Sequence, residues 1–458
     1  MSSDAVTPKS GKKEQKVKLS LLEVVGQSFS IGPLVDVALF LAIVAATAGA
    51  VGPLAVLLAS IGMVAFSMVV AFYASETGGA GAIGDYIERA WGRVAGVGAL
   101  GIYIISLVFA GAAGFSIAVG VLVSRFFVLY FDWDCPWWAG ALVVVFAAWV
   151  LNLRGAAAAT RVQLLLISVS VIPFLLTAVA AIIQAGSANT LAVFWWDNPN
   201  HGDLFEALLF SVLLFGGFET AAALAEETDN PKRAIPLALV GTVVAVALLL
   251  ILCSYAGTMY YGQEHAGKTW GNVMDGYAQM AENLLGSWAA LWIRVGVLID
   301  FFATCVGFTL AAARGLFSLG RAGFLPVVLS NSNRRGAPSG AATLVLFFAL
   351  LTIVGGLWVP AEIRYNTIFV AATGQALLLV VVYSALSFGA LRLLWRSGKQ
   401  PWWRWLVFVL ASVAPLLAFY GTVVPLPDYP ERVGFFAGIV AIGMVLLWLG
   451  WIRRKGLL

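Results

Sequence analysis

Long runs of apolar residues, separated by short polar segments, make up most of the chain beyond its first ~20 residues. A run of about 20 apolar residues is what an α-helix needs to cross roughly 30 Å of hydrocarbon. Glycine, proline and clusters of charge mark the boundaries between the runs. The pattern predicts twelve membrane-spanning helices, at 20–48, 51–74, 93–129, 137–152, 160–185, 204–225, 236–261, 288–318, 340–359, 367–394, 403–424 and 433–452.

The composition agrees with a polytopic membrane protein. Apolar residues make up 61% of the 458 residues and charged residues only 11%, whereas soluble domains carry about 25% charged residues. These values exclude an ordinary soluble enzyme, a disordered protein and a nucleic-acid-binding protein. Two of the three cysteines lie in apolar runs, so no disulfide framework is expected.

The positions of the basic residues predict the orientation in the membrane. If the N-terminus is cytosolic, 22 of the 27 Lys and Arg residues fall at the inner ends of the spans. That bias follows the positive-inside rule. It predicts an integral protein of the cytoplasmic or plasma membrane with both termini in the cytosol. Residues 1–19 are polar and lysine-rich, lack the apolar core of a signal peptide, and are predicted to form a disordered cytosolic tail.

Two spans contain residues that interrupt helices. Pro33 lacks an amide N–H and disfavours helix at Gly32 in the first span. The adjacent Gly216 and Gly217 in the sixth span each weaken a helix by about 1 kcal/mol relative to alanine. Matching interruptions in two halves are typical of an inverted-repeat carrier, with repeats at 20–185 and 204–394 and two further helices in 403–458. The alternative is that the glycines allow close helix packing.

Four segments resemble the amino acid–polyamine–organocation (APC) superfamily of secondary transporters. The most specific is F-G-G-F-E-T-A-A-A-L-A-E-E-T-D-N-P-K-R-A-I-P at 215–236, which is similar to the sixth helix of the family and the loop after it. The others are A-A-A-R-G-L-F-S-L-G-R-A-G-F-L-P at 311–326 with N-x-R-G-A-P at 333–338, the loop at 75–92, and L-N-L-R-G with R-V-Q at 151–163. The four occur in the order that the family has.

The resemblance implies an all-α membrane fold of two five-helix inverted repeats, as in LeuT-like transporters, followed by two additional helices. It implies alternating access, with a small amino acid or related amine bound midway through the lipid bilayer between helices 1 and 6. In that family, exposed helix amides bind the substrate carboxylate and unwound carbonyls bind its ammonium. The substrate-binding residues expected on this basis are Ser28, Ser30, Ile31, Gly32, Asp36, Phe215, Gly216, Gly217 and Phe218.

Asp36 departs from the family pattern. Many amino-acid carriers have G-S-G in helix 1 where this chain has Asp36-Val37-Ala38. A carboxylate here repels a substrate carboxylate and attracts an ammonium, and charge at this depth usually marks function. Asp36 therefore favours an amine, polyamine or cationic amino acid. Two alternatives are that Asp36 caps the helical segment that begins there, or that it carries a coupling proton.

The chain also departs from proton-coupled relatives that carry a lysine in helix 5, because Ser170 occupies that position. The candidates for holding a coupling ion are Gly32, Ser170, Asp300 and Thr304. Asp300 and Thr304 are four residues apart and share a helix face. The hydroxyl oxygens of Thr304 and Ser170 suit Na⁺, and Asp300 is a candidate for carrying H⁺. The alternatives are an ordinary hydroxyl-to-backbone bond for Ser170 and Thr304, and an ion pair with Arg294 for Asp300.

At the inner ends, Glu226, Glu227, Lys232 and Arg233 are predicted to form an ion network that belongs to an inner gate. The alternative is a solvated loop, in which such pairs contribute little. His201 and His265, the only histidines, fall in predicted external loops and do not resemble a metal pair. No metal and no cofactor beyond a coupling ion is expected.

These features favour a secondary transporter of amino acids or related amines. Within that class, a polyamine or monoamine carrier and an amino-acid exchanger are alternatives. A ligand sensor embedded in the membrane is the alternative from another class. No connection is long enough for a soluble catalytic domain, and no nucleophile–base pair lies at membrane depth, so an enzyme is not expected. The sequence does not indicate an oligomeric state.

Overall fold

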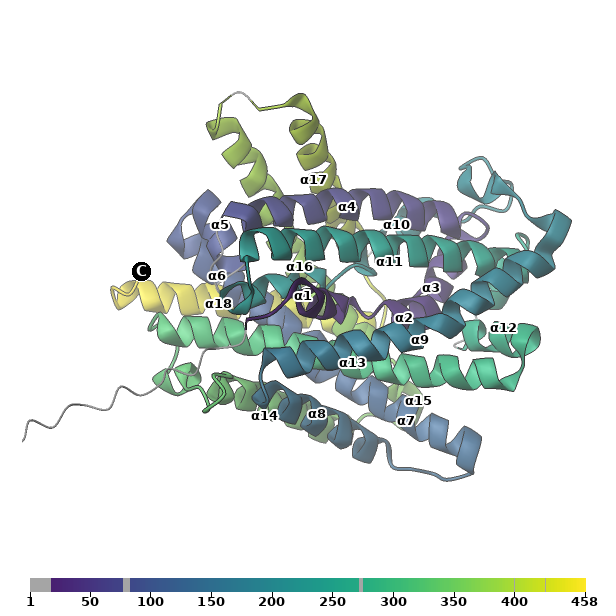
Figure 1. The fold of residues 1–458 in the computed structure, drawn as a ribbon, viewed down its shortest axis with the longest axis horizontal. Coiled ribbons are helices and arrows are strands. Elements are labelled where there is room, and N and C mark those ends of the chain that lie inside the picture. Colours follow the sequence, from purple (N-terminus) through teal and green to yellow (C-terminus); the bar gives the residue numbers. More distant parts are fainter. Residues whose placement is uncertain (1–17, 77–82, 272–274, 399, 425) are drawn as a thin grey trace, which may run out of the picture.

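A computed structural model describes residues 18–76, 83–271, 275–398, 400–424 and 426–458. Apart from two isolated main-chain bridges, all regular elements in this part of the chain are helices, and the long ones run side by side (Figure 1). They are α1 (Leu21–Ser28), α2 (Pro33–Val35), α3 (Leu41–Ala48), α4 (Gly52–Glu76), α5 (Ile83–Trp91), α6 (Arg93–Leu107), α7 (Phe115–Phe131), α8 (Trp137–Leu153), α9 (Ala156–Ala185), α10 (Leu204–Leu213), α11 (Pro231–Tyr261), α12 (Gly276–Leu285), α13 (Ser287–Arg321), α14 (Ser339–Gly356), α15 (Ala361–Arg364), α16 (Thr367–Arg396), α17 (Trp402–Val423) and α18 (Glu431–Arg454). The predicted disordered tail lies almost wholly outside the described residues.

Eleven helical segments in the described residues are long and apolar enough to cross a membrane. They include α13 with 35 residues, or about 52 Å at 1.5 Å per residue, which exceeds the hydrocarbon thickness and requires tilt or extension beyond it. The predicted fourth span corresponds to α8, a shorter apolar helix of 17 residues. The chain is therefore an all-helical integral membrane protein.

The first membrane segment leaves α-helical geometry after α1. A 3-10 turn at Phe29–Ile31 leads to Gly32, whose φ of 85° is left-handed. Glycine adopts this conformation without the steric cost of a Cβ. Pro33 then opens α2, a position where its missing N–H costs no helical hydrogen bond. A π-helical stretch at Asp36–Phe40 connects α2 to α3.

The sixth membrane segment changes geometry in a similar way. After α10, a turn reaches Gly217, whose φ is 118°. The chain continues as a 3-10 helix over Phe218–Glu227, and Asn230 (φ 46°) precedes Pro231 at the start of α11.

These two irregular segments run antiparallel and are joined at both ends by main-chain hydrogen bonds. At one end, Leu19 donates to the carbonyl of Glu227 (2.8 Å) and accepts from Asp229 (2.9 Å). At the other end, Ala50 donates to Asn200 (3.0 Å) and Gly202 donates to Ala48 (2.7 Å). The first and sixth membrane segments therefore form an adjacent pair held by bonds that do not involve side chains.

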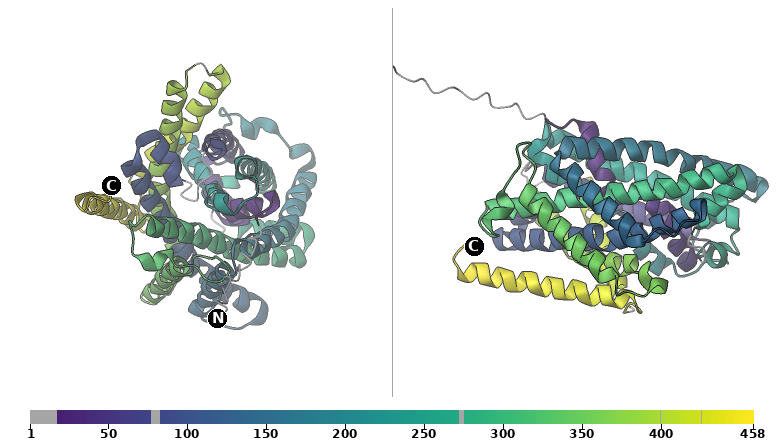
Figure 2. Two further views of the ribbon diagram at one scale, coloured as in Figure 1. Left: turned by 60° about the vertical axis from the view of Figure 1, so that its left-hand side comes forward. Right: turned by 90° about the horizontal axis from the view of Figure 1, so that it is seen from below.

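Three helices fall where the sequence predicted only connections: α5, α12 and the four-residue α15. The amphipathic α5 lies in the 75–92 loop and packs on α6, and α12 lies in the 262–287 connection and packs on α13. Both are too short to cross a membrane, which explains why a search for apolar runs misses them. Helices α17 and α18 are the least covered by the rest of the fold, and the end of α18 lies toward the same end of the molecule as the start of α1 (Figures 1 and 2).

Candidate substrate and ion site

The irregular parts of the first and sixth segments touch each other. A Cβ placed on Gly217 would lie 3.0 Å from the carbonyl oxygen of Ser30 and 2.8 Å from Cε1 of Phe308. The hydroxyl of Thr220 donates to the carbonyl of Gln27 at 3.2 Å. Only glycine permits this close approach, so two predicted substrate residues, Ser30 and Gly217, lie next to each other. Nothing in the sequence pointed to Phe308, which belongs to α13.

A network of buried amides holds the first segment against α13 and α9. Gln163 Nε2 donates to the carbonyl of Ala303 (2.7 Å) and to the hydroxyl of Ser30 (3.3 Å). Gln27 Nε2 donates to the carbonyl of Gly307 (3.0 Å), and Ser30 donates to the carbonyl of Gln27 (2.7 Å). The sequence interpretation did not assign these glutamines a role, although a polar amide inside an apolar run is a recognisable signal.

Asp300 on α13 caps the helical segment that follows Gly32. Its Oδ2 accepts hydrogen bonds from the backbone N–H groups of Leu34 (2.7 Å) and Val35 (2.9 Å). The predicted alternative, an ion pair with Arg294, is not formed, because Arg294 binds Asp275 at 2.6 Å instead. Asp300 therefore ties the first segment to α13 at the point where the helix restarts.

Three buried oxygens beside this cap have no hydrogen-bond partner among the described residues: Oδ2 of Asp36, Oδ1 of Asp300 and Oγ1 of Thr304. The Oγ1 atom of Thr304 is 3.0 Å from a Cβ placed on Gly32. The carboxylates of Asp36 and Asp300 are near enough to interact electrostatically. Buried polar atoms are nearly always paired in proteins, so this group of oxygens is suited to a cation or a proton.

Ser170, the remaining coupling-ion candidate, is buried on α9. Its Cβ lies 3.4 Å from a Cβ placed on Gly296, which is one helical turn before Asp300 on α13. The structure thus brings Gly32, Asp300 and Thr304 into contact. Ser170 of α9 faces α13 one helical turn before Asp300.

The other predicted substrate residues lie around the irregular segments, and all of them except the half-buried Gly216 are buried. Phe218 packs edge-on against Phe66 with ring centroids 6.1 Å apart, and Phe215 is fully enclosed. The hydroxyl of Ser28 is buried without a partner among the described residues. Ile31 is 6% exposed, and a Cβ on Gly216 would contact only its own helix and Leu379.

A third buried carboxylate, Glu219, stabilises the turn in the sixth segment. Its Oε2 accepts from the N–H of Gly217 (3.1 Å) and from the hydroxyl of Tyr383 on α16 (2.8 Å). Both bonds hold the backbone turn in place, so Glu219 has a structural role. Glu219 and Tyr383 are 164 residues apart in the sequence, so no local pattern could predict this hydrogen bond.

The ion network at the end of the sixth segment has different members from those predicted. Glu227 binds Arg314 of α13 through Nη2 (2.6 Å) and Nε (3.1 Å), and Glu226 lies 3.5 Å from Arg321. Within the described part of the chain, Lys232 and Arg233 make no ion pair. Both residues lie on the first turn of α11, directly after Asn230 and Pro231.

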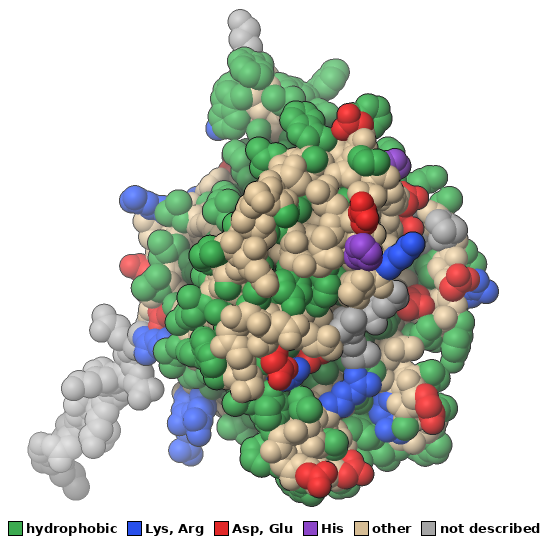
Figure 3. Space-filling model, turned by 90° about the vertical axis from the view of Figure 1, so that its right-hand side faces the viewer, with side chains coloured by type: hydrophobic (Ala, Val, Ile, Leu, Met, Phe, Trp, Pro, Cys, Tyr) green, Lys and Arg blue, Asp and Glu red, His purple; other side chains and the backbone are tan. Residues whose placement is uncertain are grey.

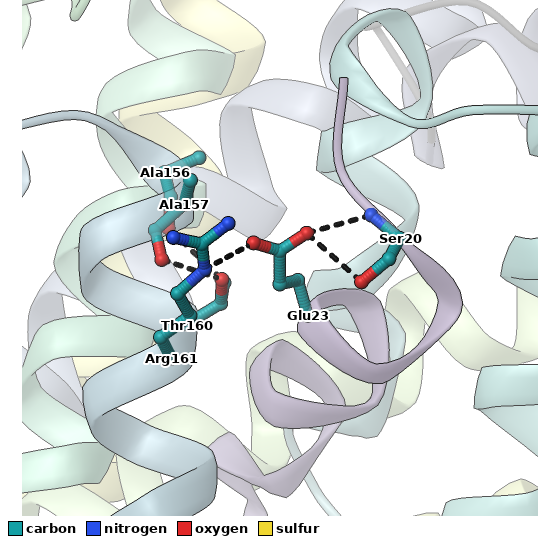
Figure 4. Close-up of polar contacts among 6 residues, drawn as sticks. All are labelled: Ser20, Glu23, Ala156, Ala157, Thr160 and Arg161. Carbon is teal, nitrogen blue, oxygen red and sulfur yellow. Dashed lines mark hydrogen bonds and ion pairs between the residues drawn. The ribbon is translucent and has the colours of Figure 1, made fainter. Parts of the chain in front are cut away.

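A second polar group lies at the start of α1 (Figure 4). Glu23 Oε2 accepts from the N–H (2.7 Å) and hydroxyl (2.9 Å) of Ser20, and Oε1 binds Arg161 of α9 at 2.5 Å. The spacing Ser-x-x-Glu is a recognisable capping box. This capping box stands at the first residues of the span, outside the apolar interior from which the candidate site residues were predicted.

We expect Arg314→Met to weaken the contact between the sixth segment and α13. Arg314 is 6% exposed and Glu227 is 39% exposed, so solvent partly screens the ion pair. We therefore expect the free energy of unfolding to fall by about 1–2 kcal/mol. Thermal unfolding of the purified protein, followed by tryptophan fluorescence, measures it. Arg321→Met is the control, because its ion pair is longer and half-exposed on both sides. Equal destabilisation by the two variants would contradict the assignment.

The opposite end of the molecule carries both histidines among mixed acidic and basic side chains (Figure 3). His201 takes part in the main-chain bridge to Gly49. Burial raises the pKa of Asp275, and the neighbouring Arg294 acts in the opposite direction. No group of three or more His, Cys, Asp or Glu residues able to hold a metal ion occurs in the part of the chain that the structure describes.

Solved structures and known sequences place this arrangement in a class and then in a family. The fold matches the manganese transporter of Eremococcus coleocola with a TM-score of 0.58 over 95% of both chains, at 12% sequence identity. The chain therefore shares the all-helical membrane fold of that protein. The sequence profile of the amino acid permease family matches residues 21–449, and the chain belongs to that family.

Two relatives illustrate the range of this family. The branched-chain amino acid permease BcaP of Lactococcus lactis subsp. cremoris is 23% identical over 326 residues, or 69% of this chain and 66% of its own. The putrescine transporter PotE of Haemophilus influenzae is 23% identical over 280 residues, or 60% of this chain and 62% of its own. The chain thus spans just under two thirds of the length of each relative. The names of both relatives are those of transporters, and the family to which this chain belongs is one of permeases.

Proposed function

We propose that this protein is a secondary transporter that carries amino acids or related amines across the cytoplasmic membrane by alternating access. Its membership of the permease family and its transporter fold support transport. In this proposal α8 also crosses the membrane, as the fourth of twelve spans. Residues 20–185 and 204–394 are inverted repeats, and both termini are cytosolic. Uptake is favoured over exchange.

The contact between the first and sixth segments carries the proposal. The substrate binds where Ser30 and Gly217 meet, and backbone groups of Gly32 and Gly216 line the same place. Irregular backbone at membrane depth is tolerated only where it is buried or lines a cavity. The buried, unpartnered carboxylate oxygen of Asp36 pairs with the ammonium that amino acids and amines share.

Transport is coupled to an ion at Gly32, Asp300 and Thr304, with Ser170 nearby. Hard oxygen donors on two helices suit a sodium ion, and two neighbouring carboxylates suit a proton. Either occupant would join the first segment to α13 in one state and release it in another. The ion pairs of Glu226 and Glu227 with α13 then form part of the gate at the inner end.

Uptake into liposomes reconstituted with the purified full-length protein tests the proposed function. Radiolabelled leucine, lysine, ornithine, putrescine and phenylethylamine are compared under an imposed sodium gradient, an imposed proton gradient and neither. We expect saturable uptake of at least one of them that exceeds uptake by protein-free liposomes. Binding of a substrate without any uptake or counterflow would contradict transport and favour a ligand sensor.

A further inference from the structure

The N–H groups at the start of the helical segment after Gly32 are all engaged or absent. Pro33 has no N–H, and those of Leu34 and Val35 donate to Asp300. The N–H of Asp36 donates to the carbonyl of Gly32 at 3.0 Å. The first N–H groups of a helix normally lack a partner, and with the positive end of the helix dipole they bind anions. In this chain, a carboxylate of the protein itself already occupies that place.

The turn in the sixth segment is engaged in the same manner. The N–H of Gly217 donates to the carboxylate of Glu219, and that of Thr220 donates to the carbonyl of Gly217 at 3.1 Å. The backbone donors identified at both irregular segments are therefore directed to carboxylates or carbonyls of the protein. A bound carboxylate would have to displace one of them.

The buried charges around these segments come from carboxyl groups, which are negative when they have lost their proton. Asp36, Asp300 and Glu219 are each at most 6% exposed. Arg314 is the one buried basic residue among the described residues, and its charge is directed to Glu227. In a medium of low dielectric constant, such a site repels an anion strongly and attracts a cation. The unpartnered Oδ2 atom of Asp36 is a ready acceptor for an ammonium group.

We propose that the carboxylate of Asp300 occupies the helix N–H groups that a substrate carboxylate would need. As a result, this permease selects amines over the parent amino acids, which differ from them by carrying a carboxylate. The inference rests on the proposed function and specifies its substrate class. Asp36 binds the ammonium, and Asp300 acts as a positioning and specificity-determining residue that excludes the zwitterion.

Matched pairs of ligands test the inference. Putrescine is compared with ornithine, and isopentylamine with leucine, by calorimetric titration of the purified full-length protein and by uptake in liposomes. Within each pair the side chain is unchanged and only the carboxylate differs. We expect the amine to bind at least about tenfold more tightly than the corresponding amino acid. A tenfold ratio of dissociation constants corresponds to about 1.4 kcal/mol of repulsion of the substrate carboxylate.

Two variants separate the role of Asp300 from that of a purely structural group. Asp300→Ala frees the N–H groups of Leu34 and Val35, and we expect the preference for the amine to fall about tenfold or more. Asp300→Asn keeps an oxygen acceptor for the same N–H groups, so it is expected to fold and to lower the preference through the lost charge alone. Asp428→Asn is the control, because that carboxylate is 97% exposed, and it should leave the preference unchanged.

The outcomes distinguish the inference from the proposed function. If ornithine and leucine bind as tightly as their amines, or if Asp300→Asn leaves the preference unchanged, the inference is wrong while transport stands. If no amine and no amino acid is taken up, the proposed function fails and the inference fails with it. A preference for amines that declines from the native protein to Asp300→Asn to Asp300→Ala supports both.

Discussion

Asp36→Asn is expected to lower the affinity for the transported amine or amino acid by about 100-fold, because a buried ammonium–carboxylate pair that loses one charge leaves the other unpaired, at a cost of about 3 kcal/mol or more. Asparagine has nearly the same shape as aspartate, and Asp36 is 6% exposed, so the protein should still fold. Calorimetric titration and initial rates of liposome uptake measure the loss.

The same variant distinguishes substrate binding from proton coupling at Asp36. If Asp36 only carries a coupling proton, Asp36→Asn retains binding and exchange but no longer responds to a proton gradient. Loss of binding in the absence of any gradient supports pairing with the ammonium. The exposed Asp428→Asn serves again as the control for removing a carboxylate elsewhere. Unchanged affinity in Asp36→Asn would remove Asp36 from the substrate site.

Gly307→Ala is expected to abolish most transport and to destabilise the protein by about 1–3 kcal/mol, the usual cost of adding a methyl group to a packed core. A Cβ at this position would overlap the hydroxyl of Ser30 and lie 2.7 Å from Nε2 of Gln163. Ser30 would lose its place between Gln27 and Gln163, and the irregular part of the first segment would shift. Uptake rate and melting temperature are the measurements.

Gly241→Ala is a matched control for that substitution. Gly241 also lies in the interior of a helix, α11, but a Cβ there meets nothing within 4 Å. Alanine is favoured over glycine in a helix by about 1 kcal/mol, so this variant should melt at the same or a higher temperature and transport normally. Equal uptake rates and equal melting temperatures in the two variants would show that close packing at Gly307 is not required for transport or stability.

Eleven of the twelve predicted spans match helices in the described part of the chain that are long and apolar enough to cross a membrane. They were predictable because the hydropathy of a span depends only on its own residues. A run of apolar residues identifies its membrane segment wherever it lies in the fold. Gly32 and Gly217 were also recognisable locally, since glycine next to proline or glycine is the residue type that a left-handed backbone requires. The amphipathic helices α5 and α12 were missed because their burial depends on neighbouring helices rather than on length.

The candidate site was predictable only in its parts. Asp36, Asp300 and Thr304 stand out as polar residues in apolar runs, and the structure brings them close to Gly32. The bond from Asp300 to Leu34 spans 266 residues, so its role as the cap of the first segment depends on tertiary structure. For the same reason the partners of Glu226 and Glu227 were assigned to nearby basic residues, whereas the structure pairs them with Arg321 and Arg314.

The main-chain bonds that join the first and sixth segments at both ends have a consequence for how the family can vary. Any substitution at Leu19, Ala48 or Ala50 other than proline retains the backbone groups that form these bonds. The residues around the site can therefore be replaced to suit new ligands while the two segments stay aligned. We expect opening toward one side of the membrane to break only the bonds at that end, so that the bonds at the other end serve as the pivot.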